Sequence, residues 1–259
     1  MLLICGSRDD RLVSEFLSLS TGAELKTELI EETELFGSCP FALERQGSST
    51  QGFLDLPQLR VSLTELQGVV LRLPRLWWPS VEFDLQDQMF VYHEVTASWF
   101  ALIDSLTCPV VNRFGLGWWL QDLSYPLELR DTLALALGAE TVELAGASLE
   151  SIRRWPAQPG DENERSGVMS VYRSAGVTIP RQECSPDLLA HLKAREAALS
   201  QWESDTGITL YRMDFETSDG LRLKWVDVQA SFSYEPKELL SESVAAALRR
   251  MTLNSEVAA

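Results

Sequence analysis

One short stretch, Tyr211–Tyr234 with the sequence YRMDFETSDGLRLKWVDVQASFSY, constrains the fold of this chain more than any other. It divides into two runs of alternating apolar and polar residues, Leu210–Glu216 and Leu221–Gln229, and each run predicts a β-strand. Between them, Ser218-Asp219-Gly220 is a turn signal, because glycine accepts the positive φ that tight hairpins need. The sequence therefore predicts a β-hairpin at this point of the chain.

Oxygen-bearing side chains lie on the predicted strands of this hairpin as well as in its turn. Asp214 is on the first strand, while Asp227 and Gln229 are two residues apart on the second and so point to one face. A carboxylate opposite a carboxylate and an amide is a suitable ligand set for Mg²⁺, which prefers oxygen ligands. Polar residues on the solvated face of an antiparallel sheet produce the same pattern. The spacing by itself leaves both interpretations open.

The charge balance limits the partners of the chain. Its 22 Lys and Arg residues face 38 Asp and Glu residues, for a net charge of −16. Such a surface repels phosphate backbones and anionic membranes, so we expect neither nucleic acid nor membrane as a partner. No apolar run approaches the roughly 20 residues that span a bilayer, and the opening MLLICGSRDD lacks the basic region of a signal peptide. We expect a cytoplasmic protein whose widely spaced cysteines are free thiols, at Cys5, Cys39, Cys108 and Cys184.

Apolar runs and helical periodicity alternate along the rest of the chain, as in proteins that mix sheets with helices. Strands are predicted at Leu2–Cys5, Phe41–Arg45, Gly52–Leu54, Leu59–Val61, Val69–Leu73, Cys108–Val111, Thr141–Leu144, Val168–Arg173 and Val177–Pro180. Helices are predicted after Asp9-Asp10 and at Phe90–Ser105, Leu127–Leu137, Asp187–Trp202 and Glu238–Met251.

Two further segments bear on function. Arg72 lies inside an otherwise apolar run, where a basic residue indicates a sheet edge, an ion pair or a bound ligand. Residues Arg153–Ser166 are rich in Pro, Gly and charge, which predicts a linker or a mobile loop.

The order of these segments resembles that of the ATP-grasp ligases, particularly the branch that matures ribosomally made peptides (graspetide or microviridin-type ligases). The N-terminal part of the resemblance runs from Leu2 to about Gly138 and the C-terminal part covers Val168–Leu253. The motifs that carry it are Ser7-Arg8-Asp9-Asp10, GVVLRLP at Gly68–Pro74, VVNR at Val110–Arg113, Asp214-Phe215, Asp219-Gly220 and Asp227-Val228-Gln229. The last of these stands where the family has a Glu-x-Asn strand.

The resemblance implies an α/β fold of two domains. Residues 1–140 would form an open α/β domain like the pre-ATP-grasp domain, and residues 141–167 a linker or a remnant of the lid. Residues 168–259 would form a truncated ATP-grasp-like α+β domain that lacks most of the lid subdomain.

The chain departs from the family where the family binds ATP. ATP-grasp enzymes place lysines on the phosphates and hold Mg²⁺ with Asp, Glu and Asn, but the segment SYPLELRD after Asn112-Arg113 contains no lysine. Asp227 shortens the family's Glu and Gln229 lengthens its Asn, and Mg²⁺ tolerates poor geometry badly. Without a cationic cradle, phosphoryl transfer loses its main electrostatic support.

Our first functional hypothesis is therefore a degenerate, catalytically inactive protein of the ATP-grasp superfamily, without catalytic residues or cofactors. It would bind a precursor peptide or pair with an active maturation enzyme, as a homodimer or heterodimer. The resemblance and the paired tryptophans place the binding surface at Arg72, Asn112, Arg113, Trp118 and Trp119.

The alternative is an active ligase with a minimal lid, which joins a carboxylate to an amine or hydroxyl of a peptide with ATP and Mg²⁺. Asp214, Asp227 and Gln229 would then hold Mg²⁺, and Arg113 or Arg130 would replace the missing lysine. A third interpretation is a purely structural domain whose acidic groups only decorate the surface. No Ser-His-Asp or Cys-His constellation stands out in the sequence, which argues against those hydrolases.

Overall fold

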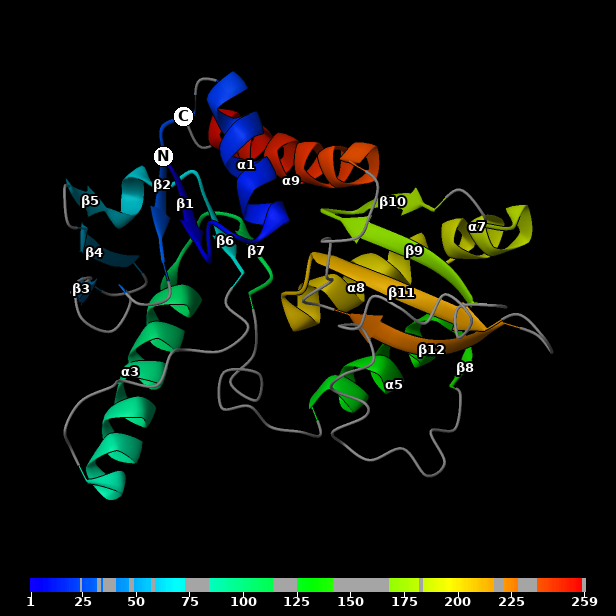
Figure 1. The fold of residues 1–259 in the computed structure, drawn as a ribbon, viewed down its shortest axis with the longest axis horizontal. Helices are drawn as coiled ribbons and strands as arrows, with labels where there is room; N and C mark the ends of the chain where they lie inside the picture. The colour runs from blue at the N-terminus through cyan, green and yellow to red at the C-terminus, as the bar shows by residue number, and fades with distance from the viewer. Residues whose placement is uncertain are drawn as a thin grey trace. The chain divides into compact units, whose positions relative to one another are not determined.

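The computed structural model describes residues 1–23, 25–31, 34, 41–46, 49–56, 59–72, 84–113, 125–141, 168–181, 184–216, 221–227 and 237–257. These residues form two compact units. Unit 1 comprises Met1–Gln121 with Ala247–Ala259, and unit 2 comprises Asp122–Ala246 (Figure 1).

Unit 1 is built on a parallel sheet of four strands in the order β2-β1-β6-β7. The strands are β1 (Leu2–Cys5), β2 (Thr27–Ile30), β6 (Gly68–Leu71) and β7 (Val110–Val111). Every residue of β1 and β6 is buried, as expected of central strands in a parallel sheet covered by helices. Helix α1 (Arg11–Gly22) follows β1, and Asp10 caps its N-terminus by accepting hydrogen bonds from Leu12 N and Val13 N.

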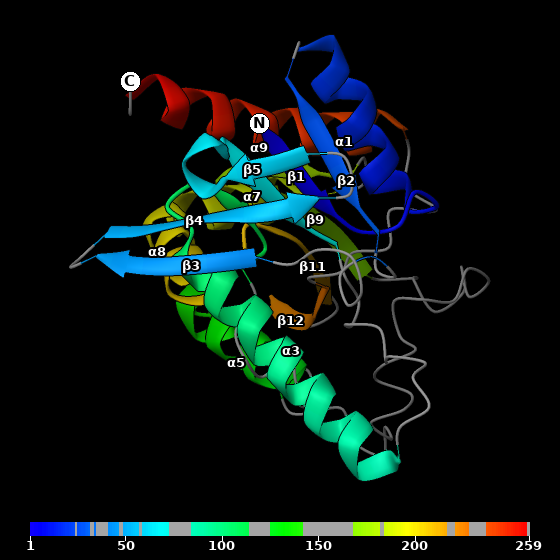
Figure 2. The same ribbon diagram turned by 90° about the vertical axis from the view of Figure 1, so that its left-hand side faces the viewer.

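An antiparallel meander and a long helix complete unit 1. The meander consists of β3 (Phe41–Gln46), β4 (Ser49–Leu56) and β5 (Leu59–Ser62), followed by the 3₁₀ turn η1 (Leu63–Glu65). Helix α3 (Leu85–Ser105) begins five residues before the predicted start at Phe90, because the Asp84 side chain caps it by accepting hydrogen bonds from Gln86 N and Asp87 N. Figure 2 shows the meander facing the viewer, with α3 extending past its strands.

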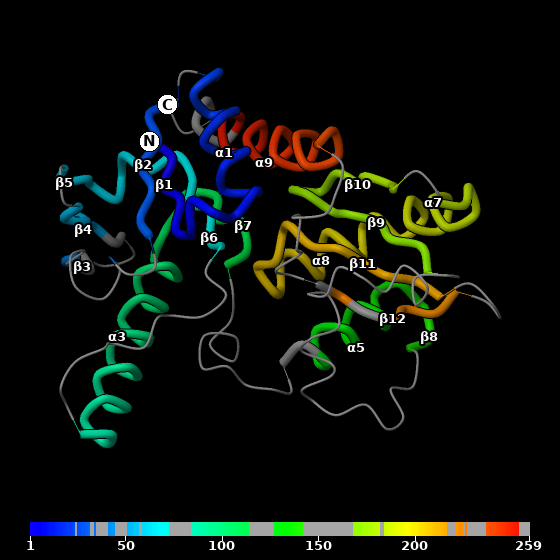
Figure 3. The backbone as a smooth tube through the Cα atoms, viewed as in Figure 1, coloured from blue at the N-terminus to red at the C-terminus, as the bar shows by residue number. Residues whose placement is uncertain are grey.

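Unit 2 is a mixed sheet of five strands in the order β10-β9-β11-β12-β8. The strands are β8 (Glu140–Thr141), β9 (Val168–Ser174), β10 (Val177–Pro180), β11 (Leu210–Glu216) and β12 (Arg222–Asp227). All neighbours are antiparallel except β12 and β8. The backbone trace in Figure 3 shows the helices α5 (Tyr125–Leu137), α7 (Pro186–Ala194) and α8 (Glu196–Thr206) beside this sheet.

The single helix predicted over Asp187–Trp202 is two helices, which corrects the sequence interpretation. The chain leaves the helical conformation at Arg195 (φ −104°, ψ 13°), which ends α7 and begins α8. Neither Gly nor Pro marks the break. The Arg195 guanidinium lies beside Gly138 at the end of α5, where a Cβ added to the glycine would be 2.8 Å from Nη2. Gly138 has φ +63° and follows α5, as its place after the predicted helix suggested.

The domain bounds expected from the sequence, with a boundary near residue 140, stay a prediction. Helix α5 groups with unit 2, where Trp202 Nε1 donates a hydrogen bond of 3.0 Å to Thr132 Oγ1. The last helix, α9 (Lys237–Val257), ends in unit 1, where Met251 packs against Gly68. Among the described residues, no helix has both the length and the apolar character needed to cross a bilayer.

Candidate functional site

The predicted hairpin exists, and its register defines which polar positions share a face. Strand β11 pairs with β12 so that Arg212 is opposite Asp227 and Asp214 is opposite Trp225, with an irregularity after Asp214. Residues directly opposite each other, and residues two apart on one strand, lie on the same face of a sheet. Positions 212, 214 and 227 therefore share a face, as the sequence predicted for Asp214 and Asp227.

Asp214 lies in a buried polar cluster that spans two strands. Its Oδ1 accepts a hydrogen bond of 2.7 Å from Ser170 Oγ, on the neighbouring strand β9. The Nε of Arg212 lies 3.1 Å from the same oxygen, and both side chains are buried. Among the described residues this Nε–H has no partner in hydrogen-bond geometry, so its contact with Asp214 is an ion pair. Asp214 thus already has a donor and a cation next to it.

Sequence reasoning missed Arg212 and Ser170 as members of this cluster. Arg212 could have been found, because it precedes Asp214 by two residues on a predicted strand and must share its face. Ser170 could not, since only the pairing of Asp214 with Ser170 across β9 and β11 brings it near.

Arg72 follows β6, and its buried side chain forms an ion pair with the partly buried Asp10. Its Nε and Nη2 donate to Asp10 Oδ2 at 3.1 Å and 2.7 Å. The other oxygen of Asp10 caps α1, so one carboxylate joins the helix N-terminus to the end of β6. Of the three roles that the sequence left open for Arg72, the structure contains the ion pair.

Asn112 and Arg113 follow β7, the strand next to β6 in the sheet. Asn112 is wholly buried with φ +59°, a left-handed conformation that Asn tolerates better than most residues. Arg113 reaches the end of α3, where Nη1 donates to the carbonyl oxygens of Ile103 (2.8 Å) and Asp104 (3.0 Å). Its Nη2 donates to that of Leu106 at 2.8 Å, so the guanidinium caps the helix C-terminus.

The sheet therefore brings Arg72, Asn112 and Arg113 to one edge, where the parallel strands β6 and β7 end. In open α/β sheets the carboxyl ends of the strands border the ligand crevice. The third candidate cation, Arg130, belongs to unit 2, and its Nε (2.9 Å) and Nη2 (2.7 Å) donate to Asp131 Oδ1.

Several predicted residues lie outside the described part of the chain. These are Gln229, Trp118, Trp119, the segment Arg153–Ser166 and the side chain of Asp227. Among the side chains that are described, no group of three or more His, Cys, Asp or Glu residues could hold a metal ion. The Mg²⁺ site predicted at Asp214, Asp227 and Gln229 therefore stays a prediction.

Comparison with known proteins finds structures of the same fold but no matching family. No family model and no curated protein matches this chain. Among solved structures, the ligase PsnB with a phosphomimetic minimal precursor, Mg and ADP has a TM-score of 0.64 and 16% identity, over 96% of this chain and 98% of the other. The macrocyclase MdnC with its precursor peptide MdnA, from Microcystis aeruginosa MRC, has a TM-score of 0.62 and 12% identity, over 96% and 100%.

A third structure agrees with these two. The RiPP-associated ATP-grasp ligase of Chryseobacterium gregarium, in complex with ADP and a leader and core peptide, has a TM-score of 0.61 and 11% identity, over 95% of both chains. The chain has the ATP-grasp fold. The α/β class and the ATP-grasp resemblance predicted from the sequence are thus confirmed at the level of the fold. No single motif was specific; the order of the motifs along the chain carried the prediction.

Proposed function

We propose that this chain is a non-catalytic protein of the ATP-grasp fold that binds a peptide in a peptide-modification pathway. The observation that carries this proposal is that the arginines at the sheet edge, and those that could replace the missing lysine, already have partners within the protein. Arg72 pairs with Asp10, Arg130 with Asp131, and Arg113 caps α3. To meet a triphosphate, Arg113 would have to give up the carbonyl oxygens at the end of α3, and leaving a helix end unpaired opposes binding. The pairs of Arg72 and Arg130 oppose it less, because Asp10 is only partly buried and Asp131 is exposed.

The peptide part of the proposal rests on the comparisons and on the position of the sheet edge. The structures of MdnC and PsnB contain precursor peptides bound to proteins of the same fold. In this chain, the edge with Arg72 and Asn112 is the place where an open α/β sheet binds its ligand. Trp118 and Trp119, which follow shortly after in the sequence, would add the aromatic anchors that peptide interfaces favour.

Two measurements test the two parts separately. Calorimetry of the full chain with ATP and Mg²⁺ should give no binding heat in the micromolar range. Heat that disappears in Asp214→Asn would overturn the non-catalytic assignment. That substitution preserves the shape of the side chain and an oxygen that can accept from Ser170, so it tests the charge without removing the hydrogen bond.

Peptide binding is tested by selection from a random-peptide library displayed on phage. Wild-type protein should enrich a sequence family that Trp118→Ala/Trp119→Ala does not retain. Failure to enrich any sequence would overturn the peptide-binding part, whatever the calorimetry gives.

One observation favours the alternative of an active ligase. Arg212 is a buried cation beside Asp214, and Asp227 lies opposite Arg212 in the register of the hairpin. This group could hold Mg²⁺ and a phosphate together once a nucleotide is present, with Asp227 and Gln229 completing the metal site. In that case Asp214→Asn should abolish ATP-dependent peptide ligation, whereas Asp205→Asn, at an exposed position on α8, should not.

A further inference from the structure

Helix α3 continues its apolar stripe beyond the part of the helix that unit 1 buries. The buried side chains on one face are Tyr92, Thr96, Trp99 and Ile103. Leu85 and Met89 extend that stripe at helical spacing, yet they are 70% and 46% exposed, and the neighbouring Phe90 is 65% exposed. Figures 1 and 2 both show this N-terminal half of α3 projecting past the other strands and helices of unit 1.

The charges on this half of α3 are all negative. Phe90 is flanked by Asp87, three residues before it, and by Glu94, four residues after it, so all three lie on one side of the helix. Both acids are exposed, and α3 contains neither Lys nor Arg. We call Leu85, Asp87, Met89, Phe90 and Glu94 the α3 tip. An acidic apolar surface repels nucleic acids and anionic membranes, so its partner must be a basic polypeptide with an apolar contact.

The C-terminal half of α9 presents the complementary pattern. Leu253 is 61% exposed and is flanked by Arg249 and Arg250, four and three residues before it, which are also exposed. Neither guanidinium has an ion-pair partner within the described part of the chain. We call Arg249, Arg250 and Leu253 the α9 end. Like the α3 tip, it belongs to unit 1.

The two surfaces cannot meet within one molecule. Figures 1 and 2 show the α3 tip and the α9 end at opposite ends of unit 1 in both views. We infer that the α3 tip binds the α9 end of a second copy of this chain. Phe90 and Leu253 supply the apolar contact, and Asp87 and Glu94 pair with Arg249 and Arg250.

This contact has to overcome the long-range electrostatic repulsion between two acidic chains. Two copies that each carry a net charge of −16 repel each other, so association depends on the local pairs and on the apolar area they enclose. Because every copy has both surfaces, two copies can exchange both contacts and close a dimer. If the contacts are not reciprocal, they build longer open assemblies instead.

Sedimentation velocity of the full chain, over a concentration range of roughly 1–100 μM, tests the inference. Wild-type protein should self-associate, and Asp87→Lys/Glu94→Lys and Arg249→Glu/Arg250→Glu should each weaken association by about tenfold or more. An equimolar mixture of the two variants should regain wild-type association. In the mixed dimer one contact has both charges reversed and the other keeps the wild-type residues, so both are attractive.

Two control variants separate this contact from general charge and general hydrophobicity. Glu238→Lys/Glu242→Lys changes the net charge by the same amount as Asp87→Lys/Glu94→Lys, at two exposed positions near the start of α9, and should not weaken association. Leu135→Gln removes an 82% exposed leucine of α5 and should likewise have no effect, whereas Phe90→Gln should weaken association. Wild-type protein that stays monomeric throughout, or a mixture that associates no better than its components, would overturn the inference.

Discussion

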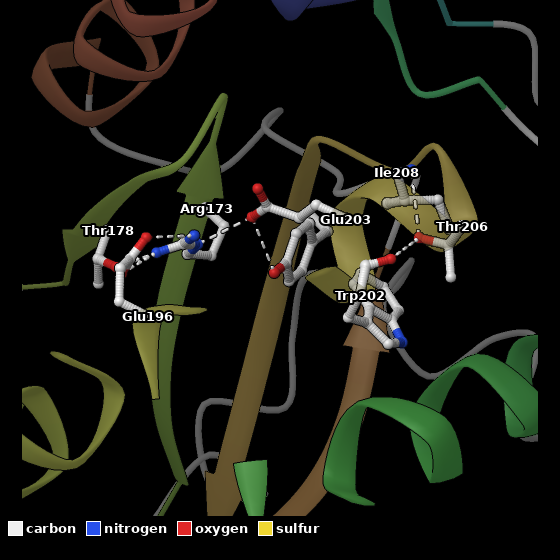
Figure 4. A network of polar contacts seen from close by, with 8 residues as sticks. Arg173, Thr178, Glu196, Trp202, Glu203, Thr206 and Ile208 are labelled. Carbon is white, nitrogen blue, oxygen red and sulfur yellow. Dashed lines mark hydrogen bonds and ion pairs between the residues drawn. The ribbon is translucent and has the colours of Figure 1, made fainter. Parts of the chain in front are cut away.

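A buried arginine in the sheet of unit 2 provides the sharpest test of how this fold is held together. Arg173 of β9 is completely buried, and Figure 4 shows its guanidinium between side chains of α8 and β10. Its Nε donates to Glu203 Oε1 (3.0 Å), and its Nη1 to Thr178 Oγ1 and Glu196 Oε2 (2.8 Å each). Its Nη2 donates to Glu196 Oε1 (3.0 Å). Burial lowers the pKa of Arg173, but the carboxylates of Glu196 and Glu203 more than compensate, so the pKa is raised and the charge is permanent.

Replacing Arg173 with Met should destabilise unit 2 by about 3–5 kcal/mol, because a buried charge then remains without its counter-charge. We expect a loss of this size because Glu203 is buried; its carboxylate also accepts a 3.2 Å hydrogen bond from the hydroxyl of Tyr211. Glu196 is half exposed and can return to water at little cost. In Arg173→Met/Glu203→Gln the orphaned charge is gone, so about half of the loss should be recovered.

Urea denaturation and hydrogen exchange of the β9 and β11 amides would measure these losses. If Arg173→Met costs less than about 1 kcal/mol, or if the double variant is no more stable than the single one, the network does not depend on charge pairing as argued.

Three further predictions follow from described contacts. Burial, and next the carboxylate of Glu203, raise the pKa of the Tyr211 phenol well above its usual value. The folded protein then holds one proton more than the unfolded chain above about pH 10, so stability should fall with rising pH there. Tyr211→Phe should flatten this fall in alkaline urea titrations, and an unchanged slope would exclude Tyr211 as its cause. Asp10→Ser keeps an α1 cap but removes the carboxylate from Arg72, and should cost unit 1 about 2 kcal/mol in urea denaturation; a loss near zero would mean that water replaces the pair. Arg113→Met should cost about 1–2 kcal/mol and speed amide exchange in the last turn of α3, and wild-type exchange there would refute its capping role.

The sequence by itself determined the elements whose signals are local. Alternation of apolar and polar residues predicted the hairpin β11–β12, and continuous apolar runs predicted the strands β1 and β6. Gly138 predicted the end of α5, because glycine adopts a positive φ without steric cost. The same alternation predicted that Asp227 and Gln229 point to one face, whereas the register of the hairpin decides that Asp214 shares a face with Asp227. The order of these elements was enough to predict the fold.

Only the tertiary structure decided which charged groups meet. Arg173 reads in the sequence as one polar residue in a short strand, and its partner Glu203 lies on a helix 30 residues later. Arg72 and Asp10, 62 residues apart, pair because parallel strands bring the end of β6 beside the start of α1. Arg113 was predicted to bind a ligand or partner. In the structure its guanidinium caps the C-terminus of α3, which lies within reach only in the folded chain. Local backbone preferences act over a few residues and can be read from them, whereas the energy of a buried charge depends on neighbours that only packing supplies.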